Sequence, residues 1–224
     1  MNRRPLSRAS VISVGVGVAL PLLLLTACGG EDDGADKGGG SKIAGADQGG
    51  DGKKSPSPSV SSTAGDRPAI KLPSDLSYSF DWKTGDPKKD AVLGDAEQFL
   101  KAVDLAIVKQ NPLHEAYRFY SEGKEAAAAQ KYVKSYSDDQ ASVTGLSRFY
   151  DASVTLKKGN QASAVYCQDM SKSFDKSLKT GKPQKTPGSK DDYVLNAMTL
   201  HKNARGIWAA SNLIAEPGSV KCQP

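Results

Sequence analysis

Toward the middle of the chain, hydrophobic positions recur with a helical period. Between Asp86 and Pro112 they lie four, three, four and three positions apart, at Val92, Ala96, Phe99, Val103 and Ala106. This spacing predicts an amphipathic helix, with Asp86 as its cap and Pro87 in its first turn. A short second helix is expected from Pro112 to Tyr120. The alanine-rich segment 125–136 predicts a third helix.

After Gly145 the period changes to two, which is typical of half-buried strands. Residues 146–156 alternate in this way, and Gly159-Asn160 is a turn signal before a returning strand over 162–171. A loop rich in lysine, glycine and proline follows, over 178–190. Segments 191–203 and 206–216 then predict a second hairpin. Helices followed by such strands predict an α+β domain, residues 75–224, with helices on one face of a curved antiparallel sheet.

The first residues have the layout of a secretory signal peptide. Arg3, Arg4 and Arg8 precede an apolar run over 11–25, which is shorter than the roughly 20 residues that a membrane-spanning helix needs. The run ends in "LTAC", residues 25–28, which resembles the bacterial lipobox. This resemblance implies a signal peptide over 1–27 and acylation of Cys28, with palmitate-type chains anchoring the protein at the outer face of the cytoplasmic membrane.

Two alternatives remain open for the leader. An ordinary signal peptide with an incidental cysteine would leave the protein secreted and unanchored. The pair Arg3-Arg4 also resembles a twin-arginine signal, which Pro5 and Leu6 match only in part. The export route therefore stays undecided between the general secretory and twin-arginine pathways.

Residues 28–74 predict a disordered tether behind the acylated cysteine. The segment consists mostly of glycine, serine, proline and charged residues, with little to bury. A flexible chain of this length spans roughly 35–40 Å. Removal of the three leader arginines lowers the net charge of the chain from +5 to +2. Nucleic-acid binders carry a larger and more clustered excess, so we exclude nucleic acid as a partner.

Three cysteines are present, and Cys28 is assigned to lipid. In an exported protein the remaining two, Cys167 and Cys222, most simply form a disulfide. Closing that loop would stabilise the fold by roughly 4 kcal/mol in the chain-entropy model. Neither cysteine has a local group that would lower its pKa, so a structural role is expected for both.

Four short phrases, "GLSRFYDASVTL", "QASAVYCQDMS", "LHKNARGIW" and the closing "VKC", are similar to those of small secreted actinobacterial lipoproteins. Together with the order of elements, they make residues 86–222 resemble the nuclear-transport-factor-2-like fold. That is the cone shared by ketosteroid isomerase and polyketide cyclases. The resemblance implies a pocket inside the cone, where the enzymes of that fold place an acid–base pair. Cystatin-like and other α+β sheets remain alternatives.

The residues that could line such a pocket are aromatic or ionisable and lie on the predicted strands: Tyr150, Asp151, Tyr166, Asp169, His201 and Trp208. A buried aspartate beside a tyrosine could abstract a proton next to a carbonyl. Each residue also has a structural interpretation: His201 beside a turn, Asp169 capping a turn, and Trp208 in the core. The chain lacks metal-ligand spacing, a phosphate-binding glycine loop and a nucleophile elbow, so no metal or cofactor is expected.

Two functions follow from these observations. The first is a non-catalytic binding or interaction module for a small apolar ligand, a cell-wall component or a cell-envelope protein. The second is a small isomerase, dehydratase or cyclase-like enzyme with Asp151 or Asp169 as base. A carboxylate and a second polar group converging in one deep pocket would favour the enzyme. A pocket lined or filled by apolar side chains would favour the binding module, which is the function we expect.

Overall fold

The computed structural model describes residues 67–224, so the predicted signal peptide, Cys28 and most of the predicted tether lie outside the described residues. The elements follow one another as β1 (Leu76–Asp81), α1 (Pro87–Val108), α2 (Glu115–Phe119), α3 (Gly123–Asp138), β2 (Ala141–Lys157), β3 (Gln161–Ser177), β4 (Pro183–Gln184), η2 (Lys190–Asp192), β5 (Tyr193–Lys202) and β6 (Trp208–Pro217). The three predicted helices and both predicted hairpins are present.

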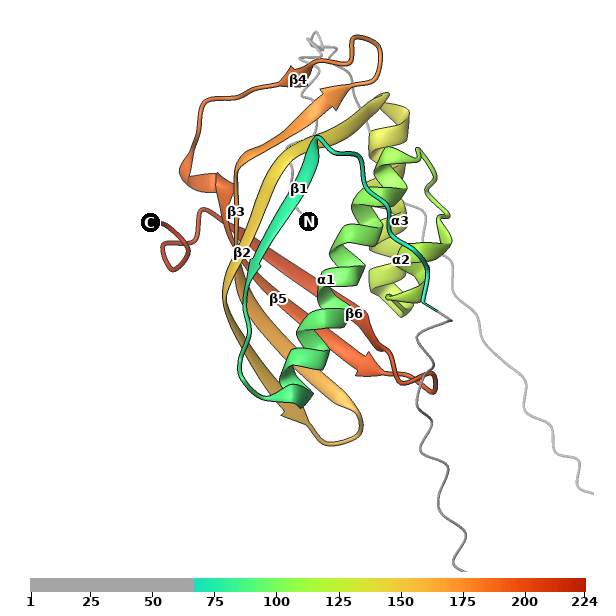
Figure 1. The fold of residues 1–224 in the computed structure, drawn as a ribbon, viewed down its shortest axis with the longest axis vertical. Coiled ribbons are helices and arrows are strands. Elements are labelled where there is room, and N and C mark those ends of the chain that lie inside the picture. The colour runs from blue at the N-terminus through green and yellow to red at the C-terminus, as the bar shows by residue number, and fades with distance from the viewer. Residues whose placement is uncertain (1–66) are drawn as a thin grey trace, which may run out of the picture. The chain divides into compact units, whose positions relative to one another are not determined.

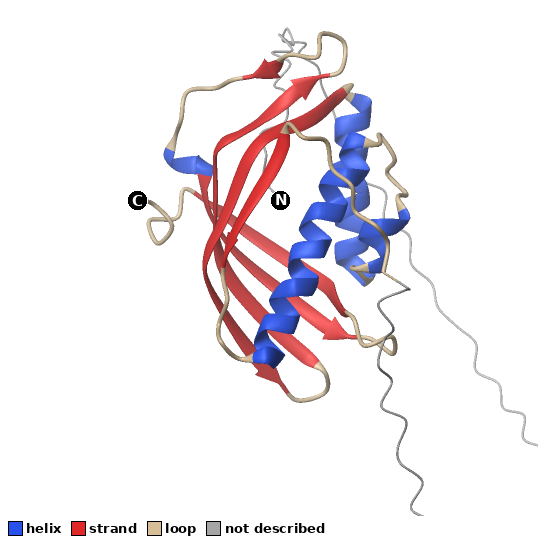
Figure 2. Cartoon of the chain, viewed as in Figure 1, coloured by secondary structure: helices blue, strands red, loops and turns tan. Residues whose placement is uncertain are grey.

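The strands form one sheet in the order β1-β2-β3-β5-β6, with β4 paired to β3. The long strands curve, and the helices lie on the concave side of the curve (Figures 1 and 2). The sheet is mixed, because β1 pairs with β2 in parallel. The prediction of an antiparallel sheet is therefore wrong at this edge. The two strands are parallel because the three helices lie between them in the chain. This helical crossover carries the chain back to the starting end of β1, so that β2 runs in the same direction as β1.

Helix α1 begins where its cap residue predicts. Asp86 accepts hydrogen bonds from the backbone N–H groups of Lys88 and Lys89 at 2.8 and 3.4 Å. The apolar stripe that predicted this helix is buried, and the buried surface is wider than the stripe because the helix lies in the concavity of the sheet. Ile70 and Leu72, which fall in the predicted tether, also pack against the core.

Aromatic rings from three strands fill the concave side beside α1. Phe149 on β2 is buried and stacks on Phe80 of β1, with ring centroids 4.7 Å apart. Trp82 lies against the same rings and meets Tyr166 of β3 edge to face, at 5.3 Å. Tyr78 extends the row, since its ring stacks on Phe80. Strand β1 thus joins the core through alternate residues, the period-two pattern that defines a strand.

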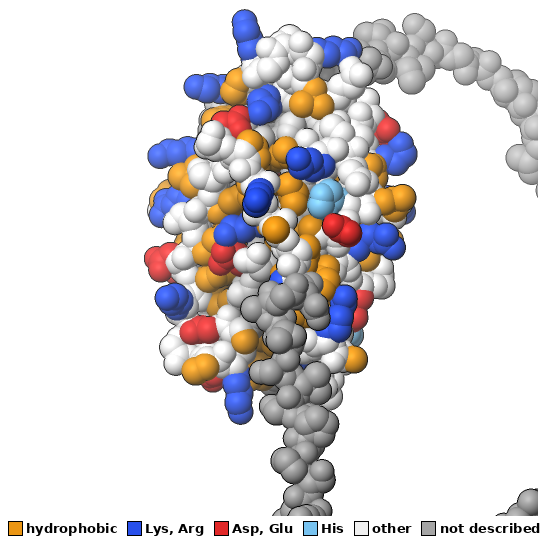
Figure 3. Space-filling model, turned by 45° about the vertical axis from the view of Figure 1, so that its right-hand side comes forward, with side chains coloured by type: hydrophobic (Ala, Val, Ile, Leu, Met, Phe, Trp, Pro, Cys, Tyr) orange, Lys and Arg blue, Asp and Glu red, His pale blue; other side chains and the backbone are white. Residues whose placement is uncertain are grey.

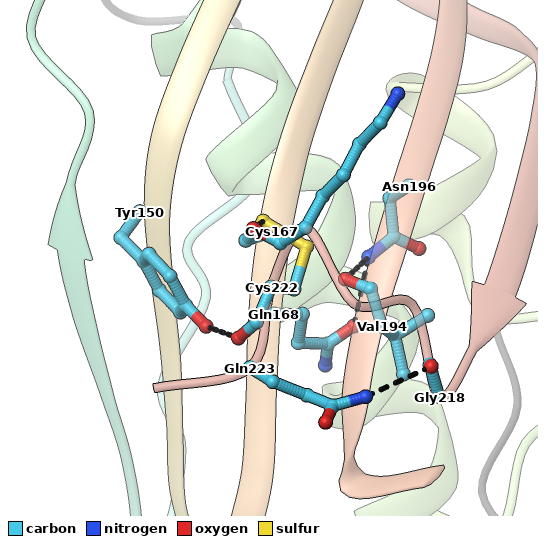
Figure 4. The surroundings of a disulfide bond; sticks show 9 residues. Tyr150, Cys167, Gln168, Val194, Asn196, Gly218, Cys222 and Gln223 are labelled. Carbon is cyan, nitrogen blue, oxygen red and sulfur yellow. Dashed lines mark hydrogen bonds between the residues drawn. A yellow bond between two sulfur atoms is a disulfide. The ribbon is translucent and has the colours of Figure 1, made fainter. Parts of the chain in front are cut away.

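The predicted disulfide is confirmed. Cys167 on β3 is bonded to Cys222 in the C-terminal tail, with Cα atoms 5.4 Å apart (Figure 4). The phenolic O–H of Tyr150 on β2 donates a hydrogen bond to the carbonyl oxygen of Cys222. The side-chain amide of Gln223 donates to the carbonyl of Gly218 at 3.0 Å. These contacts hold the last residues against the sheet.

Replacing Phe149 with alanine is expected to destabilise the fold by about 3–5 kcal/mol, because the ring is buried among four other aromatic rings. Leu156→Ala, at a position that is 37% exposed on the same strand, should change stability by less than about 0.5 kcal/mol. Urea unfolding of the mature chain measures both. Similar midpoints for the two variants would contradict the packing described for β1 and β2.

Candidate binding cleft and buried carboxylates

A surface cleft of about 400 Å³ lies beside the first described residues, Arg67 and Pro68. Its walls come from the chain at Arg67 and Pro68, the first half of α1, and the turn between β5 and β6. Polar groups line it alongside the face of an indole ring. The lining residues with polar or aromatic side chains are Arg67, Asp95, Gln98, Tyr120, Lys202 and Trp208.

Asp95 is the buried charge of this cleft. It projects from α1 and is 4% exposed. Its Oδ1 accepts a hydrogen bond from Nη1 of Arg67 at 2.5 Å, and its Oδ2 accepts one from the backbone N–H of Trp208 at 2.8 Å. The hydrogen bond from Arg67 to Asp95 raises the pKa of Arg67, so the guanidinium stays charged. Both carboxylate oxygens are therefore engaged in holding the structure.

Glu125 makes an equivalent contact farther along β6. It lies in the first turn of α3, and its Oε2 accepts a hydrogen bond from the backbone N–H of Leu213 at 2.8 Å. Between the two carboxylates, the carbonyl of Tyr120 accepts from the N–H of Ala210, and the N–H of Glu122 donates to the carbonyl of Ala210, both at 2.9 Å. The outer edge of β6 is thus paired by backbone and carboxylate groups rather than by a strand.

Cationic side chains border the cleft on the turn between β5 and β6. The Nζ of Lys202 lies 5.9 Å from the ring centroid of Trp208, and the guanidinium of Arg205 lies 4.3 Å from that of Phe119. Lys202 forms no ion pair with any residue between 67 and 224. Since Asp95 neutralises Arg67, the cleft presents a net positive charge beside an aromatic surface.

Three of the residues predicted from the strands lie away from this cleft. Tyr150 faces the C-terminal tail, where burial and then Asp169 raise the pKa of its hydroxyl. Asp151 is exposed in a bulge of β2, with a positive φ of 51°. Asp169 accepts a hydrogen bond from the N–H of Ser171 at 2.9 Å, but both residues lie within β3, which continues to Ser177, so the turn that its structural interpretation supposed does not begin there. Asp169 also lies 3.7 Å from Arg148.

The other three predicted residues have separate surroundings. Tyr166 is fully buried, burial raises the pKa of its hydroxyl, and that hydroxyl has no hydrogen-bond partner within residues 67–224. His201 pairs with Glu122, Nδ1 to Oε1, at 2.6 Å beside β6. Trp208 lies in the wall of the cleft and is 9% exposed. The structure therefore brings only Trp208 of the six to the cleft.

Sequence reasoning missed Arg67, Asp95, Tyr120 and Lys202 as cleft residues. One signal was available for Asp95, since it lies three residues after Val92 and four before Phe99, on the buried side of α1. A carboxylate in an apolar helix face indicates a buried partner. Nothing comparable marks Arg67, which lies in the predicted tether.

No group of three or more histidine, cysteine, aspartate or glutamate side chains among residues 67–224 could hold a metal ion. No helix within the same residues is both long enough and apolar enough to cross a membrane.

No family model matches the sequence, and no curated protein matches it either. Similar solved structures include the intermembrane space region of the chloroplast protein ARC6, at 11% identity over 58% of this chain and 96% of that one, with a TM-score of 0.41. A ketosteroid isomerase-like protein from Erwinia carotovora atroseptica is 15% identical over 60% of this chain and 98% of its own, with a TM-score of 0.41.

A proposed ketosteroid isomerase from Shewanella frigidimarina is also similar, at 15% identity over 56% of this chain and 94% of that one, with a TM-score of 0.29. At these identities and TM-scores, the likeness carries no argument about activity.

Asp95→Ala is expected to cost about 3 kcal/mol, because it leaves the buried N–H of Trp208 without its acceptor and Arg67 without its counter-ion. Arg67→Ala should cost less, since water in the adjacent cleft can solvate the freed Oδ1. Urea unfolding of both variants measures the difference. Equal losses would show that the bond to Trp208 contributes nothing.

Glu125→Gln is expected to become more stable relative to wild type as pH rises. Burial raises the pKa of Glu125 above its ordinary value of 4.5, so the folded chain keeps a proton that the unfolded chain has lost. Wild-type stability therefore falls, relative to the variant, from about pH 4.5 up to the folded-state pKa. Paired urea melts between pH 4 and pH 8 measure this. A difference that stays constant across that range would contradict the buried, ionisable state assigned to Glu125.

Proposed function

We propose that this protein is an extracytoplasmic lipoprotein, anchored by Cys28 at the outer face of the cytoplasmic membrane, whose domain is a non-catalytic binding module of the nuclear-transport-factor-2-like type. The lipobox-like "LTAC" and the tether behind it support the anchor. The order of helices and strands, and their packing on a curved sheet, support the fold type.

The observation that carries the non-catalytic role is the filling of the concave side of the sheet. Side chains from the strands and from α1 occupy it, and the largest of them are less than 2% exposed. Among them, Phe99, Tyr117, Tyr166 and Met198 come from four different elements. A ligand pocket on the concave side of the curved sheet would have to occupy the volume that these side chains fill. The position where an enzyme of this fold would hold its substrate is therefore packed as a core.

The cleft beside the tether supports binding of a small molecule instead. The indole of Trp208 and the small residues Ala91 and Gly94 offer an apolar surface, and Lys202 offers a positive charge that pairs with no acid among residues 67–224. A ligand with an apolar or ring portion and one anionic group matches this combination. Gln98 could add one hydrogen bond at the wall of the cleft.

The alternative enzyme requires a carboxylate with a free face in a pocket. Asp151 is exposed at a bulge, and Asp169 bonds the N–H of Ser171. Asp95 borders the cleft, but both of its oxygens accept hydrogen bonds from protein groups. No observation among the described residues favours a proton-transfer role, so we do not propose one.

Native mass spectrometry of the lipidated chain from its own host is expected to show a retained small molecule. Lys202→Gln should lose it, because the variant removes the unpaired charge at the cleft. Lys221→Gln, exposed in the C-terminal tail beside the disulfide to β3 and not part of the cleft lining, serves as the matched control and should retain it. A molecule retained equally by both variants, or absent from the parent protein, would contradict the cleft as the binding site. Loss of labelled fatty acid in Cys28→Ser tests the anchor separately.

A further inference from the structure

Lysines gather on the hairpin that joins β3 to β4. Residues 176–185, "KSLKTGKPQK", which we name the basic hairpin, hold four lysines and no acidic residue. The hairpin is closed by the N–H of Ser177 donating to the carbonyl of Lys182 at 3.1 Å and by pairing of Lys176 with Pro183. Lysine and arginine side chains project at the upper end in Figure 3, the end at which Figure 1 places β4.

Most of this charge has no role in holding the fold together. Lys176 pairs with Asp75 at 2.8 Å, but Lys179, Lys182 and Lys185 are exposed and form no ion pair within residues 67–224. Like charges held this close repel one another. Two acidic side chains lie at the base of the hairpin, and they already bond other groups: Asp75 pairs with Lys176, and Asp175 accepts from the hydroxyl of Tyr136. The arrangement therefore fits an anionic partner outside the domain.

An exposed leucine lies among these lysines, which favours a partner that has an apolar part as well as negative charge. Leu178 is 44% exposed, at the start of the turn, and its backbone N–H donates to the carbonyl of Gln140 at 2.9 Å. The backbone of Leu178 is thus fixed to the domain while its side chain is presented to the outside. An apolar side chain flanked by basic ones suits the headgroup region of a lipid bilayer, where both find favourable surroundings.

We propose that the basic hairpin docks the domain on anionic phospholipid headgroups, with Leu178 entering the interface. The inference rests on the lipid anchor of the proposed function, which would hold the domain within the tether's reach of roughly 35–40 Å from a bilayer. The acyl chains at Cys28 would supply attachment, and the hairpin would set which end of the domain faces the lipid.

Vesicle cosedimentation of the mature chain, residues 28–224 with Cys28→Ser, tests the proposal without any contribution from acyl chains. We expect binding to phosphatidylglycerol–phosphatidylcholine vesicles, no binding to pure phosphatidylcholine, and release by 0.5 M salt. Lys179→Gln with Lys182→Gln should weaken partitioning by about 30-fold, at about fivefold for each lysine. The control Lys157→Gln with Lys158→Gln removes the same charge from the β2–β3 turn at the opposite end of the sheet and should change little.

The leucine distinguishes a bilayer from a soluble polyanion. Leu178→Ser should weaken vesicle binding by about fivefold, whereas Leu156→Ser at the opposite end should not. Equal losses in the two lysine pairs, or no loss with Leu178→Ser, would overturn the proposal. Binding of polyphosphate as tight as that of anionic vesicles would also overturn it. The vesicle assay does not depend on lipidation, so the two proposals fail separately. A wild-type chain without acylation would refute the lipid anchor, and a mature chain that does not bind anionic vesicles would refute the docking.

Discussion

The fold depends on how the outer edge of β6 is satisfied. An edge strand leaves backbone N–H groups unpaired, and buried N–H groups without acceptors are costly. Here Asp95 accepts from Trp208, the carbonyl of Tyr120 accepts from Ala210, and Glu125 accepts from Leu213. Two of these acceptors are carboxylates on helices, so the helices must hold one fixed position against the strand. The packing of α1 and α3 against the sheet and the pairing of the β6 edge therefore depend on each other.

The same carboxylate determines where the cleft forms. Because Oδ2 of Asp95 is bound to β6, Oδ1 points toward the entering chain, where Arg67 pairs with it. That pairing brings the end of the predicted tether over α1 and makes it one wall of the cleft. The lining of the cleft and the path of the chain at Arg67 and Pro68 are consequently linked through one buried charge.

Local patterns in the sequence predicted the elements but not this arrangement. The stripe at Val92, Ala96 and Phe99 and the alternation after Gly145 both depend on neighbours within a few residues, which the sequence displays directly. Strand β1 was missed although Leu76, Tyr78 and Phe80 alternate with polar residues, because its parallel partner lies beyond the three helices. The cleft joins Arg67, Asp95, Tyr120 and Lys202, which no spacing relates. The one sequence signal for the cleft was Asp95, a carboxylate on the buried face of α1.

Burial of acids also changes the charge that the domain presents. The buried charged residues of the described chain are Asp95, Asp104 and Glu125, all acidic, and none is basic. Asp95 pairs with an arginine, Asp104 accepts from a tyrosine hydroxyl, and Glu125 accepts from a backbone N–H group. The surface of residues 67–224 therefore carries fewer acidic side chains than the composition of that part of the chain indicates. The same contacts that pair the edge of β6 and hold α1 against the sheet thus also reduce the acidic charge at the surface.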